Sequence, residues 1–77
     1  MSDIRTAIFG DHRELLFSMV YSMLGSVADT EDVLQETWLA WSSVDLDQIE
    51  NPRAYLVRVA VNQALAQQSA LRRRRET

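Results

Sequence analysis

Two glycines and a single proline, set between stretches of helical periodicity, constrain the fold of this chain more than any other feature. They are Gly10, Gly25 and Pro52, in a sequence of 77 residues. Between them, apolar side chains recur every three or four positions, which is the period of a helix with one buried face. No segment shows the alternation of apolar and polar residues that is typical of a half-buried strand. The sequence therefore predicts an all-α fold.

The first predicted helix covers residues 3–24, and Gly25 follows it in the position of a C-terminal cap. Gly10 lies inside this range, where it either breaks or weakens the helix. The second predicted helix covers residues 29–42. We expect it to begin at or next to Asp29, because short polar and acidic residues cap a first helical turn well.

An Asn-Pro pair at positions 51 and 52 is the clearest helix start in the sequence. Asparagine is a good N-cap, and proline fits the first helical position, where no N–H partner is needed. The third predicted helix therefore covers residues 52–70. Residues 71–77 form a basic tail that either extends this helix or frays. Residues 43–50 are mostly polar and predict a loop.

We expect one domain over residues 1–77, a small bundle of three to four helices. The chain has no cysteine and one histidine, which excludes a disulfide, a thiolate metal site and a histidine-based zinc site. Because no nucleophile constellation or Gly-rich phosphate loop is present either, we expect no enzyme, no cofactor and no metal. No membrane segment and no secretory signal are recognisable, so we expect a cytoplasmic protein.

Charge is distributed unevenly along the chain. Residues 1–50 carry ten acidic side chains and two arginines, a net charge of −8, whereas residues 51–77 carry six arginines and one acid, a net charge of +5. Two halves of opposite sign can bind two different partners. All basic side chains are arginine, whose planar fork suits phosphate and base edges, but GC-rich coding produces the same bias and explains the absence of lysine better.

Three acidic residues, Asp29, Asp32 and Glu36, share one face of the second predicted helix. On pattern alone, a solvated face is the simpler interpretation, and a docking surface for a basic partner is the functional one. Trp38 and Trp41 lie one turn apart. Tryptophans at this spacing usually belong to the core, but an exposed edge of one could stack on a base or anchor a partner.

The third predicted helix carries the parts that nucleic-acid binding needs. Arg53 and Arg58 can neutralise phosphates, Tyr55 can stack on a base, and Asn62 can read a base edge. We expect these side chains on or near one face, followed by the arginine run. A generic surface with extended arginines is a serious rival interpretation.

Two segments carry a family resemblance. Residues 24–41 read LGSVADTEDVLQETWLAW, and residues 51–62 read NPRAYLVRVAVN. The first resembles the helix of bacterial RNA polymerase sigma factors of the extracytoplasmic-function (ECF) group that reads D-A-E-D, two hydrophobic residues and Q-E. The second is similar to the N-P-x-x-W-L-x-x-hydrophobic-A-x-N pattern of the same factors. The two motifs, in this order with a short loop between them, resemble the promoter-melting domain, conserved region 2.

The resemblance implies a transcription initiation module with two partners. The first is core RNA polymerase, which the second helix would contact on the clamp helices of the beta-prime subunit. The polymerase-binding residues that the resemblance assigns are Asp32, Gln35, Glu36 and Leu39. An anti-sigma factor is a further partner that the resemblance allows.

The second implied partner is single-stranded DNA of the minus-ten promoter element. Loop 43–50 and the start of the third helix would capture a flipped base. Asn62 would help to line that pocket, and Tyr55 stands where the family usually has tryptophan. The DNA-binding residues predicted from pattern and resemblance together are Arg53, Tyr55, Arg58, Asn62, Arg72, Arg73, Arg74 and Arg75.

The sequence departs from the family pattern after Asn62. Residues 63–71 read QALAQQSAL, without the acid and the arginine that are common there, so we expect fewer DNA contacts from this stretch. The second helical domain of such factors, which reads the minus-thirty-five element, has no counterpart in these residues. A helical protein-interaction adaptor that uses Trp38 and Trp41 and does not bind DNA stays open as the alternative.

Overall fold

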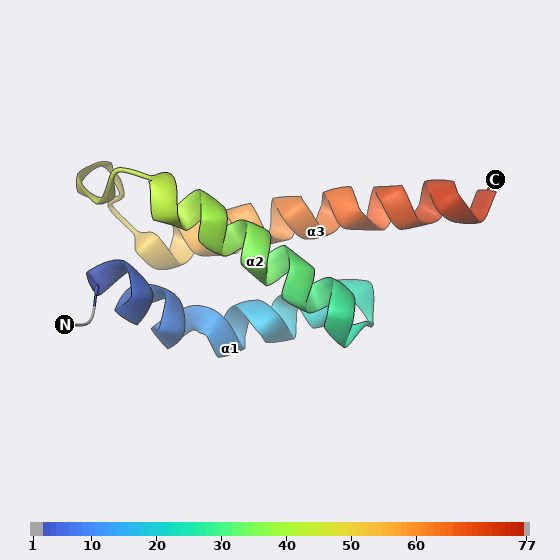
Figure 1. Ribbon diagram of the computed structural model, residues 1–77, viewed down its shortest axis with the longest axis horizontal. Coiled ribbons are helices and arrows are strands. Elements are labelled where there is room, and N and C mark those ends of the chain that lie inside the picture. The colour runs from blue at the N-terminus through green and yellow to red at the C-terminus, as the bar shows by residue number, and fades with distance from the viewer. Residues whose placement is uncertain (1–2, 77) are drawn as a thin grey trace.

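A computed structural model describes the backbone of residues 3–76 and the side chains as far as Arg74. In this part of the chain three α-helices and one short 3-10 turn form, and no strand does. Each helix packs against the other two, as Figure 1 shows. The predicted all-α fold is confirmed, with three long helices. The elements are α1 (Ile4–Leu24), α2 (Val27–Ser43), η1 (Leu46–Gln48) and α3 (Pro52–Glu76).

Helix α1 runs without a break, so Gly10 weakens the helix at most. A glycine inside a helix costs about 1 kcal/mol relative to alanine, which packing of the buried Phe9 and Leu16 on the same helix offsets. At the other end, Gly25 adopts a left-handed conformation with φ of 70°, and its N–H donates to the Tyr21 carbonyl at 2.7 Å. The predicted cap at Gly25 is therefore confirmed.

Helix α2 begins at Val27, two residues before the predicted start, so the prediction of Asp29 as its first cap was wrong. Ser26 is the N-cap, and its hydroxyl accepts from the Asp29 N–H at 3.3 Å. Thr30 is fully buried and donates its hydroxyl to the Ser26 carbonyl at 2.7 Å. The left-handed Gly25 lets the chain reverse at once, so no linker is needed.

Helix α3 begins as predicted, with the Asn51 side chain accepting from the Ala54 N–H at 3.1 Å. It continues to Glu76, so of the two alternatives for the basic tail, extension of the helix is the one observed. Arginine has a high helix propensity, and positive charge near a helix C-terminus is favourable, so the basic run extends the helix. The predicted loop 43–50 contains the short turn η1, capped by Asp45.

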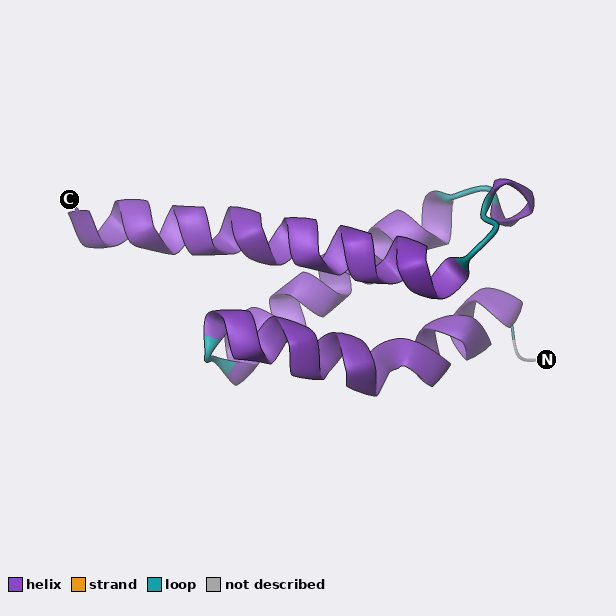
Figure 2. Cartoon of the chain, turned by 180° about the vertical axis from the view of Figure 1, so that it is seen from behind, coloured by secondary structure: helices purple, strands orange, loops and turns teal. Residues whose placement is uncertain are grey.

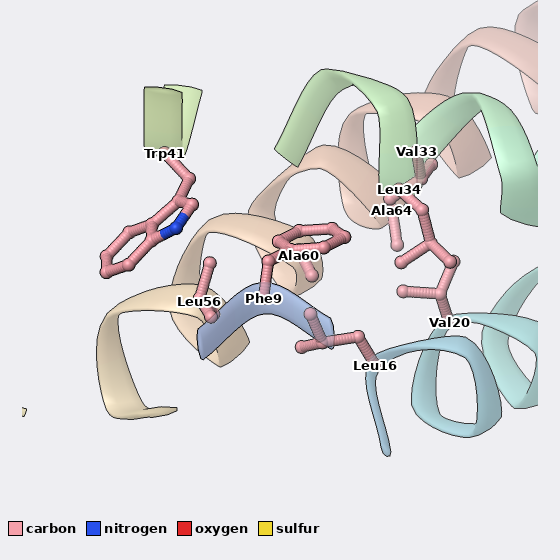
Figure 3. Close-up of a cluster of buried hydrophobic side chains, with 9 residues drawn as sticks. All are labelled: Phe9, Leu16, Val20, Val33, Leu34, Trp41, Leu56, Ala60 and Ala64. Atoms are coloured by element: carbon pink, nitrogen blue, oxygen red, sulfur yellow. The ribbon is translucent and has the colours of Figure 1, made fainter. Parts of the chain in front are cut away.

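The core lies along the line where the three helices meet, as Figure 3 shows. Its large side chains are Trp41 from α2, Leu16 from α1 and Leu56 from α3, all fully buried. Small residues, Ala60 and Ala64, line the rest of the buried face of α3 and allow close helix packing. The other buried apolar residues are Phe9, Val20, Val33 and Leu34.

The molecule is elongated, with extents of 46 × 21 × 18 Å. In Figures 1 and 2 the C-terminal part of α3 runs beyond α1 and α2, and the η1 loop lies at the opposite end. The η1 loop and the last turns of α3 therefore lie at opposite ends of the molecule. None of the described helices is long and apolar enough to cross a membrane.

Candidate functional site

The first candidate surface is a row of exposed side chains on α2, which we call the α2 stripe. It consists of Asp32, Gln35, Glu36 and Leu39, each exposed and spaced at three or four residues. Leu39 exposes 53% of its surface. The packed residues Val33 and Leu34 lie on the other side of α2. The predicted polymerase-binding residues thus form one continuous solvent-facing row.

Two neighbouring acids that the sequence places on or near this face have other contacts. Asp29 is half-buried, and its carboxylate accepts from Gln67 Nε2 on α3 at 3.3 Å. Glu31 forms an ion pair with Arg13 of α1 at 2.9 Å. Asp29 therefore takes part in the packing of α2 on α3, and Asp32 and Glu36 carry the charge of the α2 stripe.

The second candidate surface is an open cleft between the η1 loop and the first turns of α3. Its volume is about 410 Å³. Amide, carboxylate, guanidinium and aromatic groups meet there, which is a set able to hydrogen-bond and stack on a nucleobase. Its lining residues are Gln48, Ile49, Glu50, Asn51, Ala54, Tyr55 and Arg58.

The aromatic wall of the cleft is supported from inside the bundle. The ring of Tyr55 lies against the buried ring of Trp41, with centroids 5.9 Å apart. The guanidinium of Arg58 lies over Tyr55, 5.8 Å from its centroid. This cation–π contact favours the position of both side chains at the rim of the cleft. Trp41 is fully buried, so it cannot stack on a base or anchor a partner.

Of the four DNA-binding residues predicted before the arginine run, Arg53 and Asn62 do not line the cleft. Arg53 lies about half a turn around α3 from Arg58 and borders a different hollow, beside Leu15 and Met19 of α1. The expectation that Arg53 shares a face with Tyr55 was therefore wrong. Asn62 is exposed on the same side as Arg58, one helical turn further along α3, outside the cleft lining.

The third candidate surface is the arginine turn, Arg72 to Arg74, at the C-terminal end of α3. All three side chains are exposed. The side chain of Arg75, which we also predicted to contact DNA, lies outside the described residues. Arg72 lies about 21 Å along α3 from Arg58, at 1.5 Å per residue. The arginine turn and the cleft therefore lie at separate places along α3.

Sequence reasoning missed two polar residues of the cleft, Gln48 and Glu50. Both lie in the loop that the resemblance assigned to base capture, but nothing in their spacing singles them out. No group of three or more potential metal ligands lies close together among the described residues. The cleft, the α2 stripe and the arginine turn present side chains that can form hydrogen bonds and ion pairs with a partner.

Comparison with known proteins assigns the family. The family model described as Sigma-70 region 2 matches residues 8–77. The chain belongs to the sigma-70 region 2 family. It is also 43% identical over 65 residues to "ECF RNA polymerase sigma factor SigJ" of Mycobacterium tuberculosis (strain ATCC 25618 / H37Rv). Together the two matches confirm the ECF region 2 resemblance.

The sigma region 2 chain covers only part of that relative. The aligned residues are 84% of this chain and 20% of SigJ, so the chain spans about a fifth of the length of the curated relative it matches. No solved structure matches the chain at a significant level.

Proposed function

We propose that this sigma region 2 domain is a transcription initiation module that binds core RNA polymerase and recognises and melts the minus-ten promoter element. It would act without catalysis, because opening a promoter requires binding and no covalent step. The observation that carries the proposal is the presence of two separate surfaces, the α2 stripe and the cleft, on one small rigid fold of this family.

The α2 stripe is the proposed polymerase contact. It combines two carboxylates, Asp32 and Glu36, with an amide and the exposed Leu39. An apolar side chain next to fixed charges is the composition expected of a specific interface, in which charge sets orientation and apolar contact adds affinity. The partner surface would be basic, such as the clamp helices of the beta-prime subunit.

The cleft is the proposed receptor for an unstacked base. Tyr55 offers a stacking surface, and Gln48, Glu50 and Arg58 offer acceptors and donors for a base edge. Asn62 extends this polar surface by one turn and would contact the neighbouring nucleotide.

The arginine turn would bind phosphates without reading sequence. Its distance of about 21 Å from Arg58 corresponds to about six base pairs of duplex, at 3.4 Å per pair. The cleft and the arginine turn would thus contact different parts of one promoter, the first a melted part and the second a more distant backbone.

Melting then follows from differential affinity. Extruding a base costs a few kcal/mol. A protein that binds the extruded base and does not bind the stacked duplex in this way shifts the population towards the open state.

Selection of single-stranded DNA nonamers by the chain bound to core polymerase tests base reading, with core polymerase alone as the background. We expect one preferred sequence. Asn62→Ala should relax the preference at one position by about 5- to 150-fold, since one base contact contributes about 1–3 kcal/mol. Replacing Arg72 to Arg75 by alanine should weaken binding to all sequences and reduce the dependence of affinity on salt.

Two results would contradict the proposal. If the chain adds no sequence preference to core polymerase, the assignment of base reading is wrong. The alternative of an adaptor domain that does not bind DNA is then supported. If Asn62→Ala and the arginine replacement both weaken binding to every sequence by the same factor, Asn62 does not read a base.

A further inference from the structure

The C-terminus of α2 is completed by a residue from a different helix. The last turn of α2 contains no basic residue of its own, although helix C-termini favour positive charge. Arg5 of α1 supplies it. Its Nη1 donates to the Trp41 carbonyl and its Nη2 to the Val44 carbonyl, both at 2.6 Å. One guanidinium therefore holds the last turn of α2 and the first residue after it.

Trp41 returns a hydrogen bond to the same residue. Its indole Nε1 donates to the Arg5 carbonyl at 3.0 Å, and the side chain is fully buried. Arg5 and Trp41 thus bind each other in both directions across 36 positions of sequence. We call this pair of residues, with the Val44 carbonyl, the Arg5 lock.

The Arg5 lock lies directly behind the cleft. Val44 is the residue from which the chain enters the η1 loop, so holding its carbonyl fixes where that loop starts. On the other side, the Trp41 ring supports the Tyr55 ring at 5.9 Å. Tyr55 in turn carries Arg58 over its face. Arg5 therefore positions both walls of the cleft. It holds the loop through the Val44 carbonyl, and it holds the first turns of α3 through Trp41 and Tyr55.

We propose that Arg5 is a positioning residue for base selection, one that sets the shape of the cleft without touching DNA; this inference rests on the proposed function of the cleft. Two guanidinium nitrogens of Arg5 are committed to carbonyls, and the residue is half-buried. Arg5 therefore tunes which base the cleft prefers and adds no phosphate contact. Lysine cannot replace it, because a single ammonium lacks the planar fork that reaches two carbonyls together.

The first measurement needs no DNA. In ¹H–¹⁵N NMR spectra, Arg5→Met should shift the Trp41 indole signal and the amide signals of Gln48 and Glu50. Arg13→Met is the matched control, since it removes an arginine of the same helix whose partner is the surface residue Glu31. It should leave those three signals in place.

The second measurement uses the nonamer that the wild-type complex selects, and a scrambled nonamer of the same composition. Arg5→Met should lower the ratio of the two affinities by about tenfold, the contribution of one base contact. The dependence of affinity on salt should stay unchanged, because that slope counts phosphate contacts. Arg5→Lys should fold, as judged by circular dichroism, and still lose the preference; Arg13→Met should keep it.

The outcomes separate the two proposals. If the wild-type complex selects a nonamer and folded Arg5→Lys discriminates as well as wild type, the positioning role is wrong while base reading stands. A reduced salt slope in Arg5→Lys would mean that Arg5 contacts phosphate, which also overturns the positioning role. If the wild-type complex selects no nonamer, the proposed function fails and the role of Arg5 in base selection fails with it.

Discussion

The two ends of α3 are held by the rest of the bundle in very different ways. At the N-terminal end, Tyr55 packs on the fully buried Trp41, which the Arg5 lock holds in turn. At the other end, the side chains of Gln67 and Gln68 each form one hydrogen bond with the bundle. Gln67 donates to Asp29 at 3.3 Å, and Gln68 donates to the Met23 carbonyl at 2.7 Å. Beyond them α3 projects past the other helices.

This difference matches the two kinds of recognition that we propose for α3. Reading a base requires fixed geometry, because hydrogen bonds lose strength steeply with misalignment. Attracting phosphates requires charge in roughly the right place, because Coulomb interactions vary slowly with distance. The tightly packed end therefore carries the cleft, and the projecting end carries the arginine turn.

The largest expected effect comes from breaking the packed end. Trp41→Ala removes a fully buried indole and should cost about 3–5 kcal/mol of unfolding free energy. A domain this small has about 5 kcal/mol of stability in total, so the variant should be largely unfolded at 25 °C. Thermal denaturation followed by circular dichroism measures this.

Trp38→Ala is the matched control for that prediction. Trp38 is half-buried and makes an edge-to-face contact with Phe9, with ring centroids 5.3 Å apart. Removing the Trp38 side chain should lower the unfolding free energy clearly less than Trp41→Ala does. Equal destabilisation by the two variants would contradict the view that the Trp41 end is the tightly held one.

A smaller effect is expected at the projecting end. Gln67→Ala and Gln68→Ala each remove one hydrogen bond and should cost about 1 kcal/mol or less. Amide hydrogen exchange should become faster in residues 68–74 only, because local unfolding begins at a weakly held end. Faster exchange at Tyr55 in these variants would mean that the two ends are not independent.

The sequence predicted the helices because their signals are local. The left-handed Gly25, the Asn51 cap and the apolar period of each helix all act within a few residues. The predicted start of α2 was two residues too late, because Ser26 caps the helix directly after the Gly25 turn and no loop separates the two helices.

The candidate site was predictable only in part. The family resemblance assigned the four residues of the α2 stripe, and helical spacing places them in one exposed row. Arg53 was grouped with the wrong face, although helical spacing alone separates it from Tyr55 by almost half a turn. It lies beside Leu15 and Met19 of α1. The Arg5 lock joins positions 36 residues apart, and no local pattern reports such a contact.

The most direct test of the account is binding of this chain to core RNA polymerase, or to isolated clamp helices, with an Asp32→Lys/Glu36→Lys variant beside it. The matched control is Asp11→Lys/Glu14→Lys, which changes net charge equally through exposed residues of α1. We predict that wild type and control bind while the α2 variant does not. Undiminished binding by the folded α2 variant would contradict the assignment of the α2 stripe, and absence of binding by folded wild type would contradict the proposed function.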